Sequence, residues 1–134
     1  MSGLILKLGP NERVLINGAV IQNCDRRTKL SIKTPNVHVL RLKDAIHPDM
    51  ANTPVARTCY IAQLILSGDA EPEKGRKQLL VAIEQLSQVF EDFDSRRILS
   101  SATEHAIAGN AYQVLRQLKK LLPREARLFA AGEQ

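Results

Sequence analysis

The sequence lacks tryptophan, long apolar runs and any abundance of aromatic residues. Aromatic residues make up 4% of the 134 positions, so Leu, Ile, Val and Ala must fill the core. No run approaches the roughly 20 apolar residues that cross a bilayer. The opening MSGLILKLGP also lacks the basic and then apolar layout of a secretion signal. We therefore expect a cytoplasmic protein with no membrane partner.

Residues that enzymes use for catalysis do not occur in recognisable arrangements. Cys24 and Cys59 stand in different segments without a CxxC spacing, which favours two buried, reduced thiols. The seven glycines form neither a GxGxxG nor a GxxxxGKS/T phosphate loop, and no GxSxG nucleophile motif is present. His38, His47 and His105 lack the spacing of a zinc site. We therefore expect no enzymatic activity, no metal site and no cofactor.

Positive charge is concentrated in the first third of the chain. Residues 1–43 hold eight lysines and arginines against two acidic residues, which gives a net charge of +6. Residues 44–134 hold eleven basic and twelve acidic residues and carry a net charge of −1. A polyanion such as RNA is attracted to a basic surface of this kind. The ordinary alternative is a solvated basic surface, which many globular domains have.

The first 43 residues predict about five short β-strands, because apolar residues alternate there in short runs between turns. The runs cover residues 4–8, 13–16, 19–24, 30–32 and 37–39. Asn17-Gly18 predicts a tight hairpin between the second and third runs, since both positions accept positive φ. Residues 25–29 are expected to form a polar, basic hairpin tip. So small a sheet has to pack against helices or against another copy of itself.

From Thr53 onward the spacing of apolar residues predicts helices. Thr53 can cap the first helix, with Pro54 at its first position, and Gly68 ends it. A second helix opens near Pro72. It carries an apolar stripe that we expect to lie in the core: Leu79, Ile83, Leu86, Phe90 and Phe93.

Two further helices complete the expected fold. Asp94-Ser95 would cap the third, which reaches a break at Gly109-Asn110. Pro123 either ends the last helix or starts a short final turn. We therefore expect an α+β protein: a small antiparallel β region followed by a bundle of about four helices. The basic β region would span residues 1–50 and the helical region residues 51–134, and we expect the two to pack as one unit.

Three stretches resemble the FlbT family of flagellum biosynthesis repressors. They are GLILKLGPNERVLINGAV at the start, VHVLRLKDAI, and ANTPVARTCYIAQL at residues 51–64, which looks like the family's Thr-Pro, aromatic and Gln helix. The resemblance implies a regulator that associates with the 5′ untranslated region of flagellin mRNA and promotes its degradation or blocks its translation. It also implies a FlaF-like regulator or flagellin as a protein partner. A protein-binding regulator or export chaperone remains the alternative.

Residues 4–46 are also similar in layout to the small carbon-storage regulators, which bind RNA as strand-exchanged dimers. The likeness implies a homodimer and places Arg41 where those proteins have an RNA-contacting arginine. The sequence departs from them at Leu42-Lys43-Asp44, where they continue with a glutamate pair. Arginine stacks on bases and donates in a fork, and lysine attracts phosphates. The candidate RNA-binding residues are Lys7, Arg26, Arg27, Lys29, Lys33, Arg41 and Lys43.

A second row of basic residues lies near the C-terminal end, at spacings of four, four and three. It consists of Arg116, Lys120, Arg124 and Arg127. The four would share one helix face if a single helix continued through Pro123. A solvated stripe opposite the apolar face of that helix is the interpretation we prefer.

Overall fold

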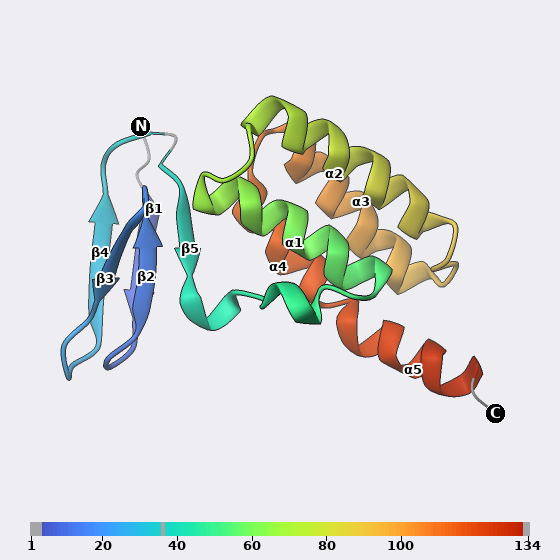
Figure 1. Cartoon of the computed structure of the whole chain (residues 1–134), viewed down its shortest axis with the longest axis horizontal. Helices are drawn as coiled ribbons and strands as arrows, with labels where there is room; N and C mark the ends of the chain where they lie inside the picture. The colour runs from blue at the N-terminus through green and yellow to red at the C-terminus, as the bar shows by residue number, and fades with distance from the viewer. Residues whose placement is uncertain (1–3, 36, 133–134) are drawn as a thin grey trace. The chain divides into compact units, whose positions relative to one another are not determined.

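A computed structural model describes residues 4–35 and 37–132 of the chain. The chain forms two compact units, Met1–Ala45 and Ile46–Gln134. Antiparallel strands occupy the first unit and helices the second (Figure 1). This arrangement confirms the predicted α+β class. No helix within the described residues is long and apolar enough to span a membrane.

The described part of the first unit contains two small antiparallel sheets. Its strands are β1 (Leu4–Leu8), β2 (Arg13–Ile16), β3 (Ala19–Gln22), β4 (Thr28–Ile32) and β5 (Val39–Arg41). β1 pairs with β4, and β2 lies between β3 and β5. Alternation turns one face of β1 and of β2 inward, whereas all four residues of β3 are exposed. The inward side chains Leu6, Leu8, Val14 and Val39 form an aliphatic core, as a chain poor in aromatic residues requires.

The hairpin predicted at Asn17-Gly18 is confirmed. Both residues have positive φ, 48° and 85°, and the turn joins β2 to β3. The expected hairpin tip at residues 25–29 is wrong, because β4 pairs with β1 rather than with β3. Asn23 holds the bend that redirects the chain: its Nδ2 donates to the carbonyl oxygens of Gly9 (2.7 Å) and Arg26 (2.8 Å).

The described part of the second unit contains five α-helices. They are α1 (Pro54–Ser67), α2 (Pro72–Ser87), α3 (Phe93–Ile107), α4 (Ala111–Lys119) and α5 (Leu122–Gly132). Short 3-10 turns cover Leu42–Asp44 in the first unit and Pro48–Met50 in the second. The predicted limits of α1 are confirmed. Thr53 Oγ1 accepts a hydrogen bond from Ala56 N at 3.2 Å, and Gly68 ends the helix with φ 83°.

Three predictions for the later helices are wrong. α2 ends at Ser87, so Phe93 is not part of its stripe: Phe93 begins α3 and is 73% exposed, whereas Phe90 is 3% exposed. The cap of α3 is Asp92, whose carboxylate accepts from Ser95 N at 3.0 Å. The last predicted helix ends earlier than expected, at Lys119, and Pro123 stands in the first turn of a full helix, α5, rather than of a short final turn.

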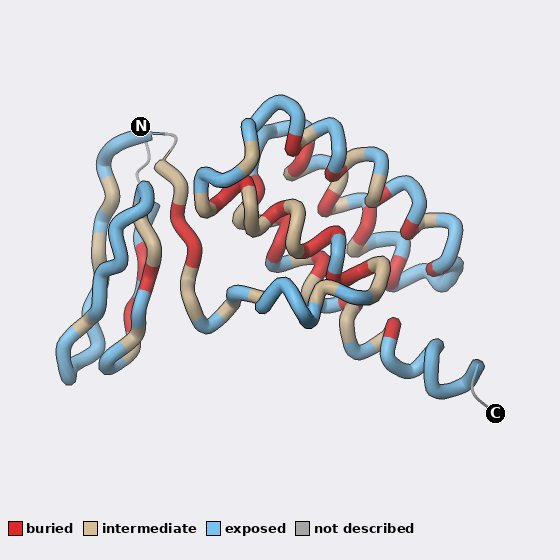
Figure 2. Tube along the Cα trace, viewed as in Figure 1, coloured by how far each residue is buried: buried red, intermediate tan, exposed pale blue. Residues whose placement is uncertain are grey.

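The core of the helical unit lies among α1, α2, α3 and α4. α1 packs against α2 and α4, and α3 packs against the same two helices. Gly75 lets α1 and α2 approach closely, since a Cβ there would lie 2.5 Å from Cγ1 of Ile65. Buried positions recur along these four helices, whereas α5 is exposed along most of its length (Figure 2). Its buried residue Glu125 accepts a hydrogen bond from Val55 N, 2.9 Å away at the start of α1.

Candidate nucleic-acid interface

Three of the predicted basic residues lie around one groove of the β unit. Lys7 in β1 and Lys29 in β4 are directly opposite each other in the antiparallel register, on the exposed face. Arg27, also exposed, comes just before β4. These three side chains, with Leu8-Gly9-Pro10 and Thr28, line a shallow groove of about 380 Å³. The described residues provide no ion pair to Lys7, Arg27 or Lys29.

Three other predicted basic residues are exposed but do not line this groove. Arg26 precedes Arg27, and its backbone carbonyl accepts from Asn23 and Thr28, so the backbone of this turn is fixed while the side chain stays exposed. Lys33 follows β4 and is also exposed. Lys43 Nζ lies 3.8 Å from Glu12 Oε2, and its side chain is 62% exposed.

Arg41 is held inside the β unit rather than presented on its surface. Its Nη1 donates to Glu12 Oε2 at 2.7 Å and its Nη2 to the carbonyl oxygen of Lys7 at 2.9 Å. The side chains of Arg41 and Glu12 are only 12% and 9% exposed. Arg41 therefore links β5 to Glu12 through the ion pair and to β1 through the carbonyl oxygen of Lys7.

Glu12 has its charge stabilised by these partners. Burial by itself would raise its pKa. The hydrogen bond from Gly9 N, 2.9 Å long, and the positive charge of Arg41 outweigh burial, so the pKa lies below its ordinary value of 4.5. Sequence reasoning missed this residue. The signal was present, because Glu12 is one of only two acidic residues in the basic third of the chain.

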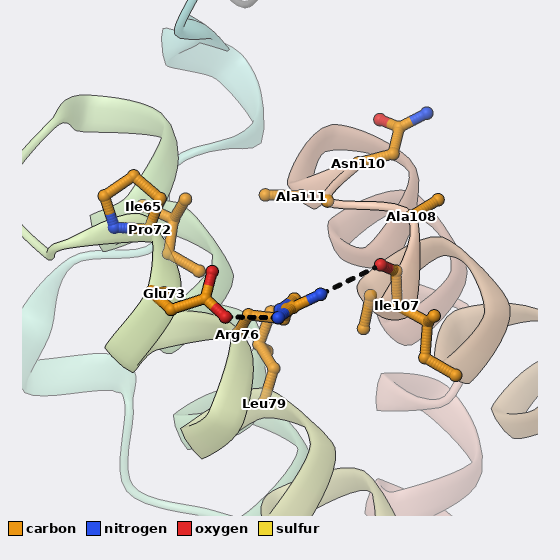
Figure 3. Close-up of a pocket in the computed structure, with 11 residues that line it drawn as sticks. Ile65, Pro72, Glu73, Arg76, Leu79, Ile107, Ala108, Asn110 and Ala111 are labelled. Atoms are coloured by element: carbon orange, nitrogen blue, oxygen red, sulfur yellow. Dashed lines mark hydrogen bonds and ion pairs between the residues drawn. The ribbon is translucent and has the colours of Figure 1, made fainter.

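A separate pocket of about 150 Å³ lies in the helical unit (Figure 3). Ile65, Leu79 and Ala111 are among the apolar residues that line it. Arg76 pairs with Glu73 on α2, and its Nη1 donates to the carbonyl oxygen of Ile107 at 3.2 Å. Apolar side chains and this charged pair thus line the same pocket. No motif or spacing in the sequence pointed to it.

The two cysteines differ in their surroundings. Cys59 is buried, as expected, and burial raises the pKa of its thiol to about 12. Cys24 is exposed, so the prediction of two buried thiols is wrong for it. Its segment crosses between the two sheets at the surface, where no strand covers it. Within residues 4–35 and 37–132, no three His, Cys, Asp or Glu side chains are grouped to hold a metal ion.

Known proteins match this chain over nearly its whole length. The family described as flagellar protein FlbT matches residues 4–129. A "Probable flagellum biosynthesis repressor protein FlbT" of Rhodopseudomonas palustris (strain TIE-1) is 32% identical over 127 residues, which cover 95% of this chain and 98% of that protein. "FlbT 1" of Bradyrhizobium diazoefficiens is 28% identical, with coverage of 93% and 84%. No solved structure matches the chain.

Proposed function

The chain belongs to the FlbT family of flagellar proteins, and on this basis we propose that it regulates flagellin synthesis after transcription. The relatives are named as repressors of flagellum biosynthesis, which makes the chain a flagellar regulator. In our proposal it acts in the cytoplasm by binding the 5′ untranslated region of flagellin mRNA. Binding then promotes degradation of the message or blocks its translation, with no catalytic step by this chain.

The groove formed by Lys7, Arg27 and Lys29 carries this proposal. Like charges directly opposite each other in an antiparallel pair destabilise a sheet. Lys7 and Lys29 occupy such positions, and no described acidic residue neutralises them. An RNA phosphate between them would relieve the repulsion and release counterions. The arrangement is therefore better explained by an anionic ligand than by the stability of the sheet alone.

The chemistry of the β unit favours contacts to the RNA backbone. Residues 1–45 contain no Phe, Tyr or Trp, so His38 is the one aromatic ring that the sequence of this unit offers to a base. Arg26, Lys33 and Lys43 would extend the positive field around the groove. We assign Arg41 a positioning role, because its guanidinium already binds Glu12 and the carbonyl oxygen of Lys7.

A binding experiment with the full chain tests this function. The variant K7A/R27A/K29A removes the three groove cations, and K74A/K77A/R127A removes three exposed cations of the helical unit as a charge-matched control. Both are titrated against labelled flagellin leader RNA at one salt concentration, after circular dichroism has shown that they fold. We expect at least a tenfold loss for the groove variant and little change for the control. Equal losses in the two variants would contradict a defined groove.

The apolar pocket of Figure 3 favours a second function, binding of a protein partner. Ile107 lines this pocket and is 58% exposed, so an apolar segment of flagellin or of a FlaF-like regulator would cover it. The variant I107E leaves the buried core intact. Calorimetry with each purified partner tests the idea: loss of binding in I107E would support it, and tight binding by I107E would exclude this pocket.

A further inference from the structure

An exposed aromatic side chain stands at the start of α3. Phe93 is 73% exposed, and the guanidinium of Arg97, one helical turn later, lies 5.9 Å from the centroid of its ring. A large apolar side chain this exposed costs free energy in water unless something covers it. The guanidinium lies over the ring, which leaves much of the aromatic surface accessible.

A polar groove of about 380 Å³ adjoins this residue. Arg97, Ile98 and Ser101 of α3 line it together with Gln117, Lys120 and Arg124, and Asp94 is its acidic member. The sequence does not indicate that Arg97 and Lys120 line the same groove, because more than twenty positions separate them.

The cations of this groove are not equally available. Arg124 Nη1 donates to Ser95 Oγ at 2.9 Å and to Asp92 Oδ2 at 3.2 Å, so its charge is largely matched. Lys120 Nζ has a 3.3 Å contact with the neutral Gln117 Oε1. Within the described part of the chain, neither Arg97 nor Lys120 has a carboxylate partner. Besides Arg124, two cations thus line the groove, and Asp94 is the one acidic residue among its lining residues.

We propose that Phe93 and this groove bind single-stranded RNA, with a base stacked on Phe93 and a phosphate between Arg97 and Lys120. The inference rests on the proposed RNA-binding function and adds a second contact surface to it. Unpaired bases stack on aromatic rings without regard to sequence, and arginine reinforces the stack. A duplex buries its base faces and cannot use such a platform.

The chemistry of this surface complements that of the β unit. The groove at Lys7 and Lys29 offers charge without any aromatic residue, so it attracts phosphates of any RNA. Phe93 supplies the stacking surface that those residues lack, which selects RNA with unpaired bases. An mRNA leader with single-stranded loops has both the phosphates and the unpaired bases that these surfaces would bind.

The experiment measures affinity of the full chain for a labelled 12-nucleotide oligouridine and for flagellin leader RNA. F93L keeps an apolar side chain but removes the aromatic face, F93W restores it, and F129L removes the half-exposed Phe129 of α5 as a matched control. R97Q/K120Q removes the two groove cations, with K74Q/K77Q as the charge-matched control. Melting temperatures of all variants establish that they fold.

We expect F93L to weaken oligouridine binding by about tenfold, within the range for loss of one base stack, and F93W and F129L to bind like the unmodified chain. R97Q/K120Q should reduce the slope of log affinity against log salt by about 0.7, the contribution of the one phosphate that the two cations share. Folded F93L and R97Q/K120Q with unchanged affinity and slope would overturn the inference while leaving the RNA-binding function standing. Failure of the unmodified chain to bind either RNA would overturn the proposed function itself.

Discussion

Replacing Arg41 should destabilise the β unit rather than remove an RNA contact. Its ion pair with Glu12 is 2.7 Å long, with side chains 12% and 9% exposed. Breaking a buried pair by removing one partner costs about 3–5 kcal/mol. Lys43, 3.8 Å from Glu12 Oε2, keeps part of the compensating charge in R41Q. We therefore expect a loss of roughly 2 kcal/mol in the free energy of unfolding for R41Q. For E12Q, where Lys43 gives no such compensation, we expect a loss of about 3 kcal/mol or more.

Hydrogen–deuterium exchange read by mass spectrometry suits this test, because residues 1–45 contain no aromatic reporter. A loss of roughly 2 kcal/mol should speed the exchange of β2 and β5 amides about thirtyfold. The double variant should lose less than the sum of the single variants, with a coupling of about 1 kcal/mol or more. The RNA affinity of E12Q is informative as well. This variant carries more net positive charge, so charge alone would raise its affinity for RNA, whereas destabilisation of the β unit would lower it.

The effect should also depend on pH in a defined direction. The pKa of Glu12 is lowered in the folded chain, so the pair stabilises the fold above the ordinary pKa of 4.5 and this stabilisation is lost as pH falls through the lowered value. Exchange in R41Q and the unmodified chain should therefore converge in strong acid. Normal exchange in R41Q at neutral pH, together with a selective loss of affinity for flagellin leader over scrambled RNA, would refute the reasoning and make Arg41 a reader of RNA.

Three further outcomes follow from burial and hydrogen bonding. Phe90→Ala should lower the free energy of unfolding by about 3 kcal/mol, whereas Phe93→Ala should change a thermal melt little. Iodoacetamide at neutral pH should modify the exposed Cys24 and spare Cys59, whose pKa is raised to about 12; mass spectrometry of the folded chain reads this directly. Glu125→Ala should cost about 1–3 kcal/mol in chemical denaturation, because it removes the acceptor of a buried amide at the start of α1.

Local chemistry made part of the fold predictable from the sequence. The hairpin at Asn17-Gly18 and the limits of α1 at Thr53 and Gly68 depend on neighbouring residues alone, and these predictions are confirmed. Phe93 misled the prediction because its spacing from Phe90 fits a continuing helix, although α2 had ended at Ser87.

Features that depend on contacts distant in sequence were not predictable in the same way. Counting charges located the basic third of the chain, but only the β1–β4 register places Lys7 opposite Lys29. Arg41 and Glu12 meet although 29 positions separate them, so their pairing leaves no local pattern. Only the structure therefore shows which basic residues line the groove and that Arg41 is paired with Glu12.

The salt dependence of binding to flagellin leader RNA tests the central claim most directly. Affinities of the full chain and of the folded K7A/R27A/K29A variant are measured across a salt series. Each phosphate neutralised on a single strand contributes about 0.7 to the slope of log affinity against log salt. Loss of the phosphate shared by Lys7 and Lys29 and of a second one at Arg27 should therefore flatten the slope by about 1.4. A slope and affinity identical to those of the unmodified chain would contradict RNA binding by the basic groove.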